Sequence, residues 1–323
     1  IFMAEMSFEQ LWADVVPVPQ VDAPDAVVKI AYSKEFTNLM DLFRAVQKKE
    51  EYSERVLELI EELLELNAGN YTVWLYRRNC LKKLKLDLNE ELDYLDGFSK
   101  ENPKNYQIWH HRRTIVEWLG NGDRELAFCE SVFEVDAKNY HAWAHRQWAL
   151  QTYNLWDKEL AFIEKCLKTD IRNNSAWNQR WFYVHSGPEA QSIEVLNREV
   201  AYCVDSLVQV TLNESAWNYL RGLYKTHHQE LHEIIRTKVE EMVESSNRKN
   251  PFALGLLADI CEYTGNQLLT AGPNEATQAV QELREASKIC VELVSLDQIR
   301  AKSWTRRVRT LNLRADSVVV EAV

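Results

Sequence analysis

The chain has 323 residues, a formal net charge of −11 at pH 7, and only nine glycines and seven prolines. The acidic balance argues against a nucleic-acid-binding protein, and no apolar run approaches the ~20 residues that a membrane-spanning helix needs. The scarcity of helix-breaking residues and the length favour a largely helical chain with a sizeable buried core.

Residues 1–34 are predicted to form an extended segment ahead of the helical part of the chain. No signal-peptide pattern opens this segment. Ile1 and Phe2 precede Met3 and look like a cloning remnant, so native numbering is expected to begin at Met3. We expect a cytoplasmic protein.

From residue 35 to residue 314 the chain repeats a helical unit. A tryptophan recurs at steps of 35, 34, 34 and 40 residues, at Trp74, Trp109, Trp143, Trp177 and Trp217. An asparagine stands four residues before each of them, at Asn70, Asn105, Asn139, Asn173 and Asn213. An arginine follows the first four by three residues, at Arg77, Arg112, Arg146 and Arg180. A degenerate copy holds Asn250 and Leu254, and an atypical last copy surrounds Trp304. A period in the mid-thirties indicates a solenoid of helical pairs.

The second copy illustrates the predicted unit. Asn105 is a good N-cap for a helix that carries Tyr106, Trp109, Arg113 and Val116 on one face. The sequence GNGD at 120–123 ends that helix, and a second helix is predicted to start near Arg124. One such pair cannot bury its apolar face alone, so the units must stack. The predicted fold is all-α: a right-handed, crescent-shaped superhelical solenoid of about seven antiparallel helix pairs, similar to a tetratricopeptide array, with a C-terminal tail at 315–323.

The repeated tryptophan and arginine are expected to belong to the core. Three residues apart on a helix, they are neighbours, and an arginine over an indole face is a common packing arrangement. The repeated asparagine is expected to cap helices. These markers explain a fold and do not by themselves indicate an activity.

No metal site or self-contained catalytic motif is predicted in this chain. Its six cysteines lie singly inside predicted helices without a C-x-x-C pair, which fits a reducing cytosol. His228 and His232 are four residues apart and could share a metal, but no third ligand stands at a recognisable spacing, so a solvated helix face is expected. Glycine motifs for phosphate, dinucleotide or acyl-transfer sites are absent.

The loop and first turn before each tryptophan differ between copies in a way that suggests a ligand site. The middle copies place a lysine, then a tyrosine, then an amide or imidazole there: Lys104, Tyr106 and Gln107, followed by Lys138, Tyr140 and His141, with Tyr71 in the first copy. Helix N-termini favour anions. Stacked units would bring these groups to roughly 10 Å of one another. We predict that they form a ridge for a ligand with a phosphate or carboxylate; solvated loop lysines are the alternative.

The segments NYTVW, KNYQIWHHRR, KNYHAWAHRQW, NNSAWNQRW and NESAWNYLRG, in this order and spacing, resemble the protein prenyltransferase alpha-subunit family. The match is to the alpha subunit shared by protein farnesyltransferase and protein geranylgeranyltransferase type I. The segment WADVVPVPQVDAPDAVVKIAYSKEF resembles the stretch before the first helix pair of that subunit. The resemblance covers nearly the whole chain and weakens late, at the Leu254 copy and in the tail LRADSVVVEAV.

The resemblance implies a heterodimer that transfers farnesyl or geranylgeranyl from the prenyl diphosphate to the cysteine of a C-terminal C-a-a-X sequence. The beta subunit, an obligate partner, would hold the zinc and most of the isoprenoid pocket, and magnesium could accompany the diphosphate. Lys104 corresponds to the catalytic lysine beside the diphosphate, and Gln107 to the glutamine that binds the peptide carboxylate. Tyr71 would lie by the peptide. The other implied substrate-binding residues are Tyr106, Asn139, Tyr140 and His141.

Two alternatives stay open. A non-catalytic helical-repeat scaffold would transfer no prenyl group with any partner. The related Rab geranylgeranyltransferase alpha subunit shares the repeats, but that enzyme would not turn over a short C-a-a-X peptide. The choice between farnesyl and geranylgeranyl is not encoded here, because the beta subunit sets that pocket.

Overall fold

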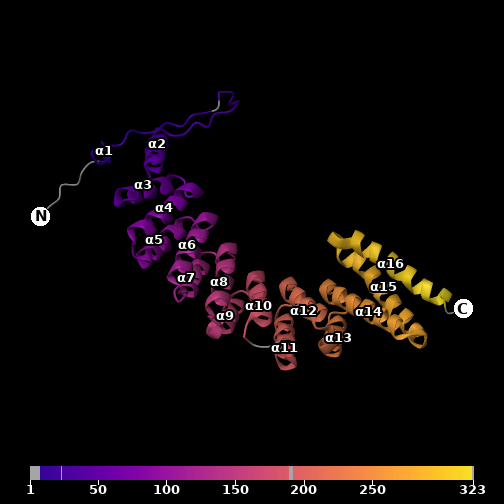
Figure 1. Cartoon of the computed structure of the whole chain (residues 1–323). Helices are drawn as coiled ribbons and strands as arrows, with labels where there is room; N and C mark the ends of the chain where they lie inside the picture. The colour runs from indigo at the N-terminus through magenta and orange to yellow at the C-terminus, as the bar shows by residue number, and fades with distance from the viewer. Residues whose placement is uncertain (1–7, 23, 189–191, 322–323) are drawn as a thin grey trace. The chain divides into compact units, whose positions relative to one another are not determined.

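The computed structural model describes residues 8–22, 24–188 and 192–321, and the regular elements within these ranges are all helical (Figure 1). The α-helices are α1 (Phe8–Leu11), α2 (Lys34–Lys49), α3 (Glu54–Leu66), α4 (Tyr71–Leu84), α5 (Leu88–Glu101), α6 (Tyr106–Leu119), α7 (Glu125–Val135), α8 (Tyr140–Tyr153), α9 (Glu159–Thr169), α10 (Asn174–Ser186), α11 (Ile193–Gln209), α12 (Glu214–Thr226), α13 (His228–Ser245), α14 (Pro251–Ala271), α15 (Ala276–Leu296) and α16 (Ala301–Glu321). Short 3-10 helices span Trp156–Lys158, Pro273–Glu275 and Gln298–Arg300. The all-α, tandem-helix prediction is confirmed.

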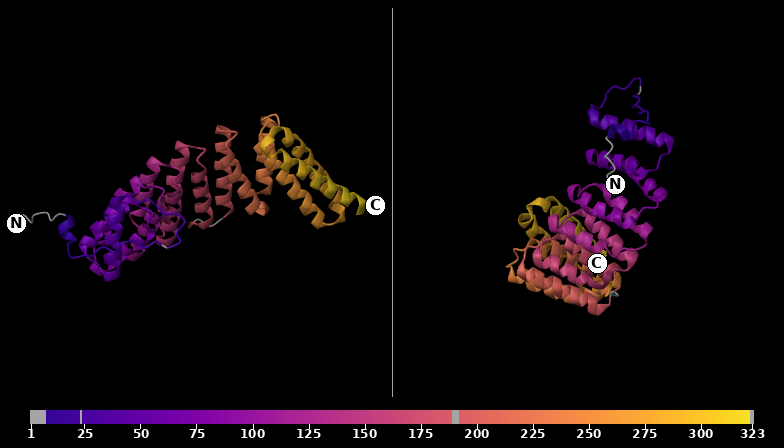
Figure 2. Two further views of the ribbon diagram at one scale, coloured as in Figure 1. Left: turned by 90° about the horizontal axis from the view of Figure 1, so that it is seen from above. Right: turned by 90° about the vertical axis from the view of Figure 1, so that its left-hand side faces the viewer.

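The chain divides into two compact units, residues 1–155 and 156–323. Within the first unit, α4, α6 and α8 pack side by side, and within the second, α10, α12 and α14 do the same (Figure 2). Helices α14, α15 and α16 form a longer three-helix end to the second unit. Helix α16 runs through Glu321, across the predicted start of a tail at residue 315. The division into segment, repeat domain and tail stays a prediction.

Six helices begin one residue after the repeated asparagine, as predicted. We call α4, α6, α8, α10, α12 and α14 the capped helices and α3, α5, α7, α9, α11 and α13 the intervening helices. In each capped helix the asparagine Oδ1 accepts from backbone N–H groups of the first turn, at 2.8 Å from the Gln107 nitrogen in α6, for example. A local side-chain bond therefore sets the start of every capped helix.

From α3 to α14 the helix pairs are shifted by one helix from the predicted unit, whereas α14 packs most extensively against α15, which follows it. Each intervening helix packs against the capped helix that follows it, α3 with α4, α5 with α6 and α7 with α8. In the five capped helices that carry the tryptophan, its indole ties down the preceding loop: the indole of Trp109 donates to the Pro103 carbonyl at 3.2 Å, and the other four make the same bond six residues back. The hairpin therefore closes across this loop and not across the GNGD turn.

The repeated tryptophans and arginines are buried in the core, as predicted, but the ring that three of the arginines contact is not the indole. Arg77, Arg112 and Arg180 are buried, and each lies over an aromatic ring of the next intervening helix, at 4.1 Å from Tyr94, 3.4 Å from Phe128 and 3.6 Å from Tyr202. Each guanidinium also makes a two-bond pair with a buried glutamate of that helix, as in Arg112 to Glu125 at 2.8 and 2.9 Å. A buried guanidinium is stabilised when it bonds to both oxygens of a carboxylate. The position of the glutamate therefore determines where the arginine side chain lies.

These three glutamates, and Glu159 at the equivalent place in α9, also accept a hydrogen bond from the capped helix of their own hairpin. We call each such glutamate with its partners a carboxylate joint. The donors are His111 to Glu91 at 2.8 Å, His145 to Glu125 at 2.5 Å, Gln179 to Glu159 at 2.7 Å and Tyr219 to Glu199 at 2.6 Å. Every joint thus fastens an intervening helix to its own capped helix, and at Glu91, Glu125 and Glu199 a buried arginine also connects the capped helix of the preceding hairpin.

The late copies depart from this pattern. Leu254 is fully buried in α14 in the tryptophan slot. Trp304 lies within α16, and its indole donates to the Asp297 carboxylate at 3.0 Å instead of to a backbone carbonyl. The segment around Trp304 therefore does not repeat the loop contact of the earlier copies, because its tryptophan bonds to a carboxylate that precedes the helix.

Candidate functional site

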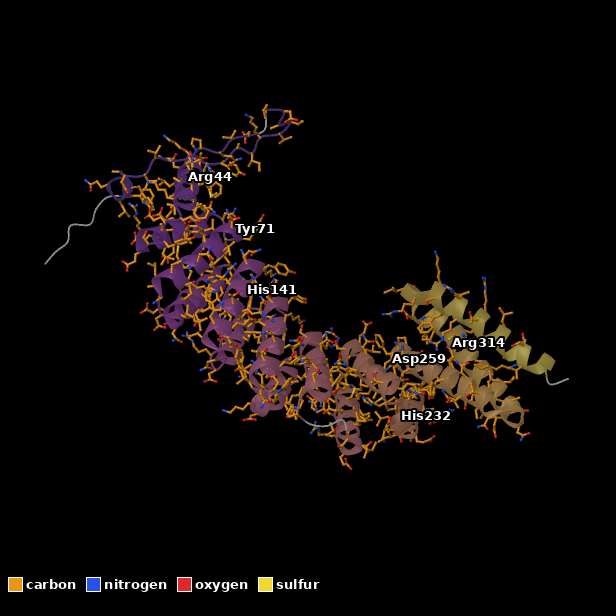
Figure 3. The ribbon with its side chains drawn as sticks, in the orientation of Figure 1. Arg44, Tyr71, His141, His232, Asp259 and Arg314 are labelled. Atoms are coloured by element: carbon orange, nitrogen blue, oxygen red, sulfur yellow. The ribbon has the colours of Figure 1, made fainter. Side chains whose placement is uncertain are left out.

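The ridge is formed at the N-termini of α4, α6 and α8 in the first unit. Tyr71, Tyr106 and Tyr140 are the first residues of these helices, and their side chains remain 71%, 68% and 70% exposed. Each of these three equivalent phenols therefore leaves most of its surface open to water. Tyr71 and His141 lie along the same edge of the first unit in Figure 3.

His141 links two of the repeats. Its ring meets Tyr106 of the preceding capped helix edge-on at a centroid distance of 4.3 Å and lies 5.6 Å from Tyr140. Burial lowers the pKa of His141 below its ordinary value, against the opposing effect of a hydrogen bond to the Lys104 backbone. The imidazole is therefore neutral at neutral pH and donates or accepts a hydrogen bond without carrying charge.

The loop that carries Lys104 is held from three directions. The Pro103 carbonyl accepts from the Trp109 indole and from Asn139 Nδ2, at 3.2 and 3.0 Å, and the Lys104 backbone bonds to His141. The Lys104 side chain itself is exposed, and none of the described residues forms an ion pair with it. A fixed backbone with a free ammonium group can present a positive charge at a defined place.

Gln107 is half-buried in the first turn of α6. Its backbone N–H donates to the cap Asn105 at 2.8 Å, and its carboxamide bonds to none of the residues described by the structure. The free carboxamide could donate to a carboxylate that approaches the helix N-terminus, where the unpaired N–H groups already favour negative charge.

Asn139 differs from the other predicted site residues because its side chain is buried and both its oxygen and its nitrogen already form hydrogen bonds within the chain. Oδ1 accepts from the Ala142 N–H at 3.0 Å, and Nδ2 donates across the repeat to Pro103. Asn213 and Asn250 make the same cross-repeat bond, to Ile171 and Thr211. The ridge therefore brings Lys104, Tyr106, Gln107, Tyr140 and His141 together, with Asn139 beneath them as a support.

The sequence argument missed one further exposed position. Leu75 lies one turn after Tyr71 and is 51% exposed, although it follows the buried Trp74 directly. The corresponding residues one step after the later tryptophans are His110, Ala144, Asn178 and Asn218, and all are exposed. The exposure of this position was predictable from helical spacing. The residues three before and one after the tryptophan are four apart, so they share one face of the helix.

The described residues include no group of three or more His, Cys, Asp or Glu side chains that could hold a metal ion. His232 instead pairs with the Tyr224 hydroxyl at 3.1 Å. All six cysteines are free thiols, and five of them are buried. Over the described parts of the chain, the helices are too short or too polar to cross a bilayer.

Comparison with known proteins agrees with these features. A family model for the protein prenyltransferase alpha subunit repeat matches residues 53–84, 88–119, 123–153 and 156–186. The protein farnesyltransferase/geranylgeranyltransferase type-1 subunit alpha of Pisum sativum is 41% identical over 313 residues, which are 92% of this chain and 92% of that protein. A geranylgeranyl transferase type-2 subunit alpha of Bos taurus is 34% identical over 96 residues, 26% of this chain and 17% of that protein.

Among solved structures, one titled as Candida albicans protein geranylgeranyltransferase-I complexed with GGPP is similar at a TM-score of 0.78 and 29% identity. The match covers 96% of this chain and 100% of that chain. Each matched repeat begins at an intervening helix and ends with the capped helix that follows, which is the pairing seen in the structure. The chain therefore belongs to the protein prenyltransferase alpha-subunit family.

Proposed function

We propose that the chain is the alpha subunit of a cytoplasmic, heterodimeric C-a-a-X protein prenyltransferase. Together with a beta subunit it transfers farnesyl or geranylgeranyl from the prenyl diphosphate to the cysteine of a C-terminal C-a-a-X sequence. The observation that carries the proposal is the 41% identity to a farnesyltransferase/geranylgeranyltransferase type-1 alpha subunit across 92% of both chains. The free thiols support a reducing compartment.

The metal belongs to the partner in this proposal. Zinc would keep the acceptor cysteine as a thiolate, and the described residues of this chain offer no ligand cluster for it. Magnesium, if it accompanies the diphosphate, would be held by phosphate oxygens with carboxylates of the complex.

The proposed reaction forms a carbon–sulfur bond and breaks a carbon–oxygen bond. The thiolate attacks the first carbon of the prenyl chain, and the electron pair of the broken bond leaves with the diphosphate. Lys104 acts as a catalytic residue by meeting the negative charge that grows on the leaving oxygen. Its backbone is anchored through Pro103 and His141, while its side chain is free to reach the diphosphate.

The remaining ridge residues bind and orient. Gln107 donates to the terminal carboxylate of the peptide, and Tyr71 lies against the peptide. Tyr106, Tyr140 and His141 line the isoprenoid and diphosphate side, and the neutral imidazole supplies a hydrogen bond there. Asn139 acts as a positioning residue, because its carboxamide already bonds to the Ala142 N–H at the helix cap and to the Pro103 carbonyl.

Co-expression with a beta subunit tests the proposal. We expect an obligate heterodimer that buries more than ~2,000 Å² and that prenylates a short C-a-a-X peptide in single turnover. Transfer only to escort-presented Rab proteins would identify the Rab-specific enzyme instead. A stable, fully folded monomer that transfers no prenyl group with any partner would identify a scaffold.

A further inference from the structure

Helix α16, which packs along α15 in the second unit, carries a line of exposed cations (Figure 1). We call Lys302, Arg306, Arg309 and Leu313 the basic stripe. They follow one another at steps of four, three and four residues, so they lie along one side of the helix. All four side chains are exposed, and Leu313 is 71% exposed. At about 1.5 Å per residue the stripe is roughly 16 Å long.

The basic stripe lies opposite the packed face of α16. Leu311 and Ala315 are fully buried, and the long helix against which α16 packs is α15. Arg309 and Leu313 each stand two residues from Leu311, which is about 200° around the axis of an α-helix. The stripe therefore projects from the side of α16 that is turned away from the core of its own unit.

The cations of α16 divide into a paired set and an unpaired set. From residue 298 to residue 315 the sequence has six cations and no acidic residue. On the side toward α14, Arg307 bonds to Asp259 at 2.7 Å and Arg314 bonds to Glu262 at 2.8 Å. The three cations of the stripe form no ion pair with the residues that the structure describes. Their charge is therefore available to an external anionic surface.

The shape and composition of the stripe favour a lipid bilayer as that surface. The stripe stands on the outer side of a single helix, and none of its residues lines the hollow between α15 and α16 that Asn312 and Asp316 help to form. Peptide recognition uses a groove or a sheet edge, whereas a straight, outward-facing helix side can lie on a plane. A helix that only covers the end of a repeat array needs polar residues of either sign and no exposed leucine.

The net charge of −11 does not prevent such contact. At physiological ionic strength charges are screened over about 8 Å, so acidic residues remote from the contact have little effect on it. Cations that touch an anionic membrane surface each raise the affinity by about fivefold. Three of them, helped by one leucine, give weak and reversible binding.

We propose that the basic stripe of α16 is a docking surface for an anionic membrane. Lys302, Arg306 and Arg309 bind anionic lipid headgroups, and Leu313 enters the boundary between the headgroups and the acyl chains, with α16 lying in the plane of the membrane surface. The inference goes beyond the proposed function, because it concerns where the enzyme stands and not the transfer of the prenyl group.

Sedimentation of the assembled heterodimer with lipid vesicles tests the inference. The wild-type complex should bind vesicles that contain phosphatidylserine and should not bind vesicles of phosphatidylcholine alone. Replacing the three cations together should lower the partition coefficient by about 100-fold, in the variant Lys302→Ala, Arg306→Ala and Arg309→Ala. The matched control changes the net charge equally and should bind as the wild type does; it replaces three exposed lysines of the same unit, in Lys158→Ala, Lys165→Ala and Lys168→Ala.

Two further variants identify what the stripe recognises. Arg306→Lys with Arg309→Lys keeps the charge but removes the guanidinium forks, so vesicle binding should persist. Leu313→Ser should lower vesicle binding by about 3- to 10-fold, because a buried apolar group is lost. All of these variants should keep wild-type thermal unfolding and wild-type transfer to a short peptide in solution, since the altered side chains are exposed.

Four results would overturn the inference. The first is a wild-type heterodimer that does not bind phosphatidylserine vesicles, which leaves the proposed function standing. The second is equal vesicle binding by the triple-alanine variant and its control, which points to another face of the complex. The third is binding to a polyglutamate peptide but not to vesicles, with loss of that binding in the lysine variant, which points to an acidic protein segment. The fourth is failure of the triple-alanine variant to assemble, which places the stripe in the subunit interface.

Discussion

Glu125→Gln is expected to destabilise the first unit strongly, because Glu125 is the centre of a fully buried joint. The carboxylate accepts two bonds from Arg112 at 2.8 and 2.9 Å and one from His145 at 2.5 Å, so it connects α6, α7 and α8. Its side chain is 1% exposed, and that of Arg112 is also 1% exposed. Glutamine keeps the shape but places an NH₂ group where an acceptor is needed.

The expected loss follows from what remains around Arg112. Removal of one partner of a buried ion pair costs about 3–5 kcal/mol. Arg112 keeps a second bond, to Asp96 at 2.6 Å, and that carboxylate is 36% exposed. Because the Arg112 charge retains this partly hydrated partner, the free-energy cost should lie at the lower end of that range. We therefore expect the unfolding free energy to fall by about 3 kcal/mol.

Hydrogen exchange in the intact heterodimer measures this loss where it occurs. A loss of about 3 kcal/mol corresponds to more than 100-fold faster exchange for amides of α6 and α8 that are protected through opening of this unit. Glu117→Gln is the matched control, because Glu117 pairs with Arg113 on the exposed face of α6, where both side chains are about half exposed. That change should cost less than about 1 kcal/mol. Equal, small effects of the two substitutions would show that the buried carboxylate is not structural.

Three further outcomes are expected. Burial holds the pKa of His145 below its ordinary value, so the unfolded chain binds more protons below about pH 6.5 and the unfolding free energy falls as the pH drops through that window. His145→Gln should weaken this pH dependence at little cost near pH 8, since Gln179 already fills the equivalent place, and an unchanged pH profile of thermal unfolding would contradict the reasoning. Lys104→Ala should lower the single-turnover transfer rate by roughly 100-fold with little change in prenyl diphosphate affinity, whereas Lys138→Ala should be near neutral; a normal rate in the Lys104 variant would remove the lysine from the chemistry. Gln107→Ala should weaken peptide binding by about 10- to 100-fold and leave the diphosphate affinity unchanged, and equal losses for both substrates in equilibrium binding would indicate a structural role.

The starts of the capped helices were predictable because their cause is local. An asparagine that caps its own first turn acts over two or three residues, so Asn105 alone marks where α6 begins. The exposure of Tyr106 follows from the same register, since it lies three residues before a buried tryptophan.

The partners of the buried arginines were not predictable in this way. Arg112 lies beside Trp109 in the sequence, yet it turns to Glu125 and Phe128 on another helix. That choice depends on which helices pack together, and from α3 to α14 the hairpins begin one helix earlier than the repeat suggested by the tryptophans.

In the candidate site, too, the local features were predictable and the contacts between repeats were not. The residue types at the ridge were visible from the repeat, but the support beneath Lys104 was not. It depends on Asn139 and His141 reaching back across the repeat to residues 103 and 104, more than thirty positions earlier.

The carboxylate joints also show where this chain tolerates changes of length. In all four, the glutamate and the donor from its own hairpin are 20 residues apart in the chain. The arginine that comes from the preceding hairpin is 14, 13 or 19 residues before its glutamate. Helix α11 has 17 residues where α7 and α9 have 11, and its additional turns precede Glu199. Insertions are therefore accommodated between hairpins and excluded from within them, because an added residue inside a hairpin would rotate the donor away from a carboxylate that has no access to water.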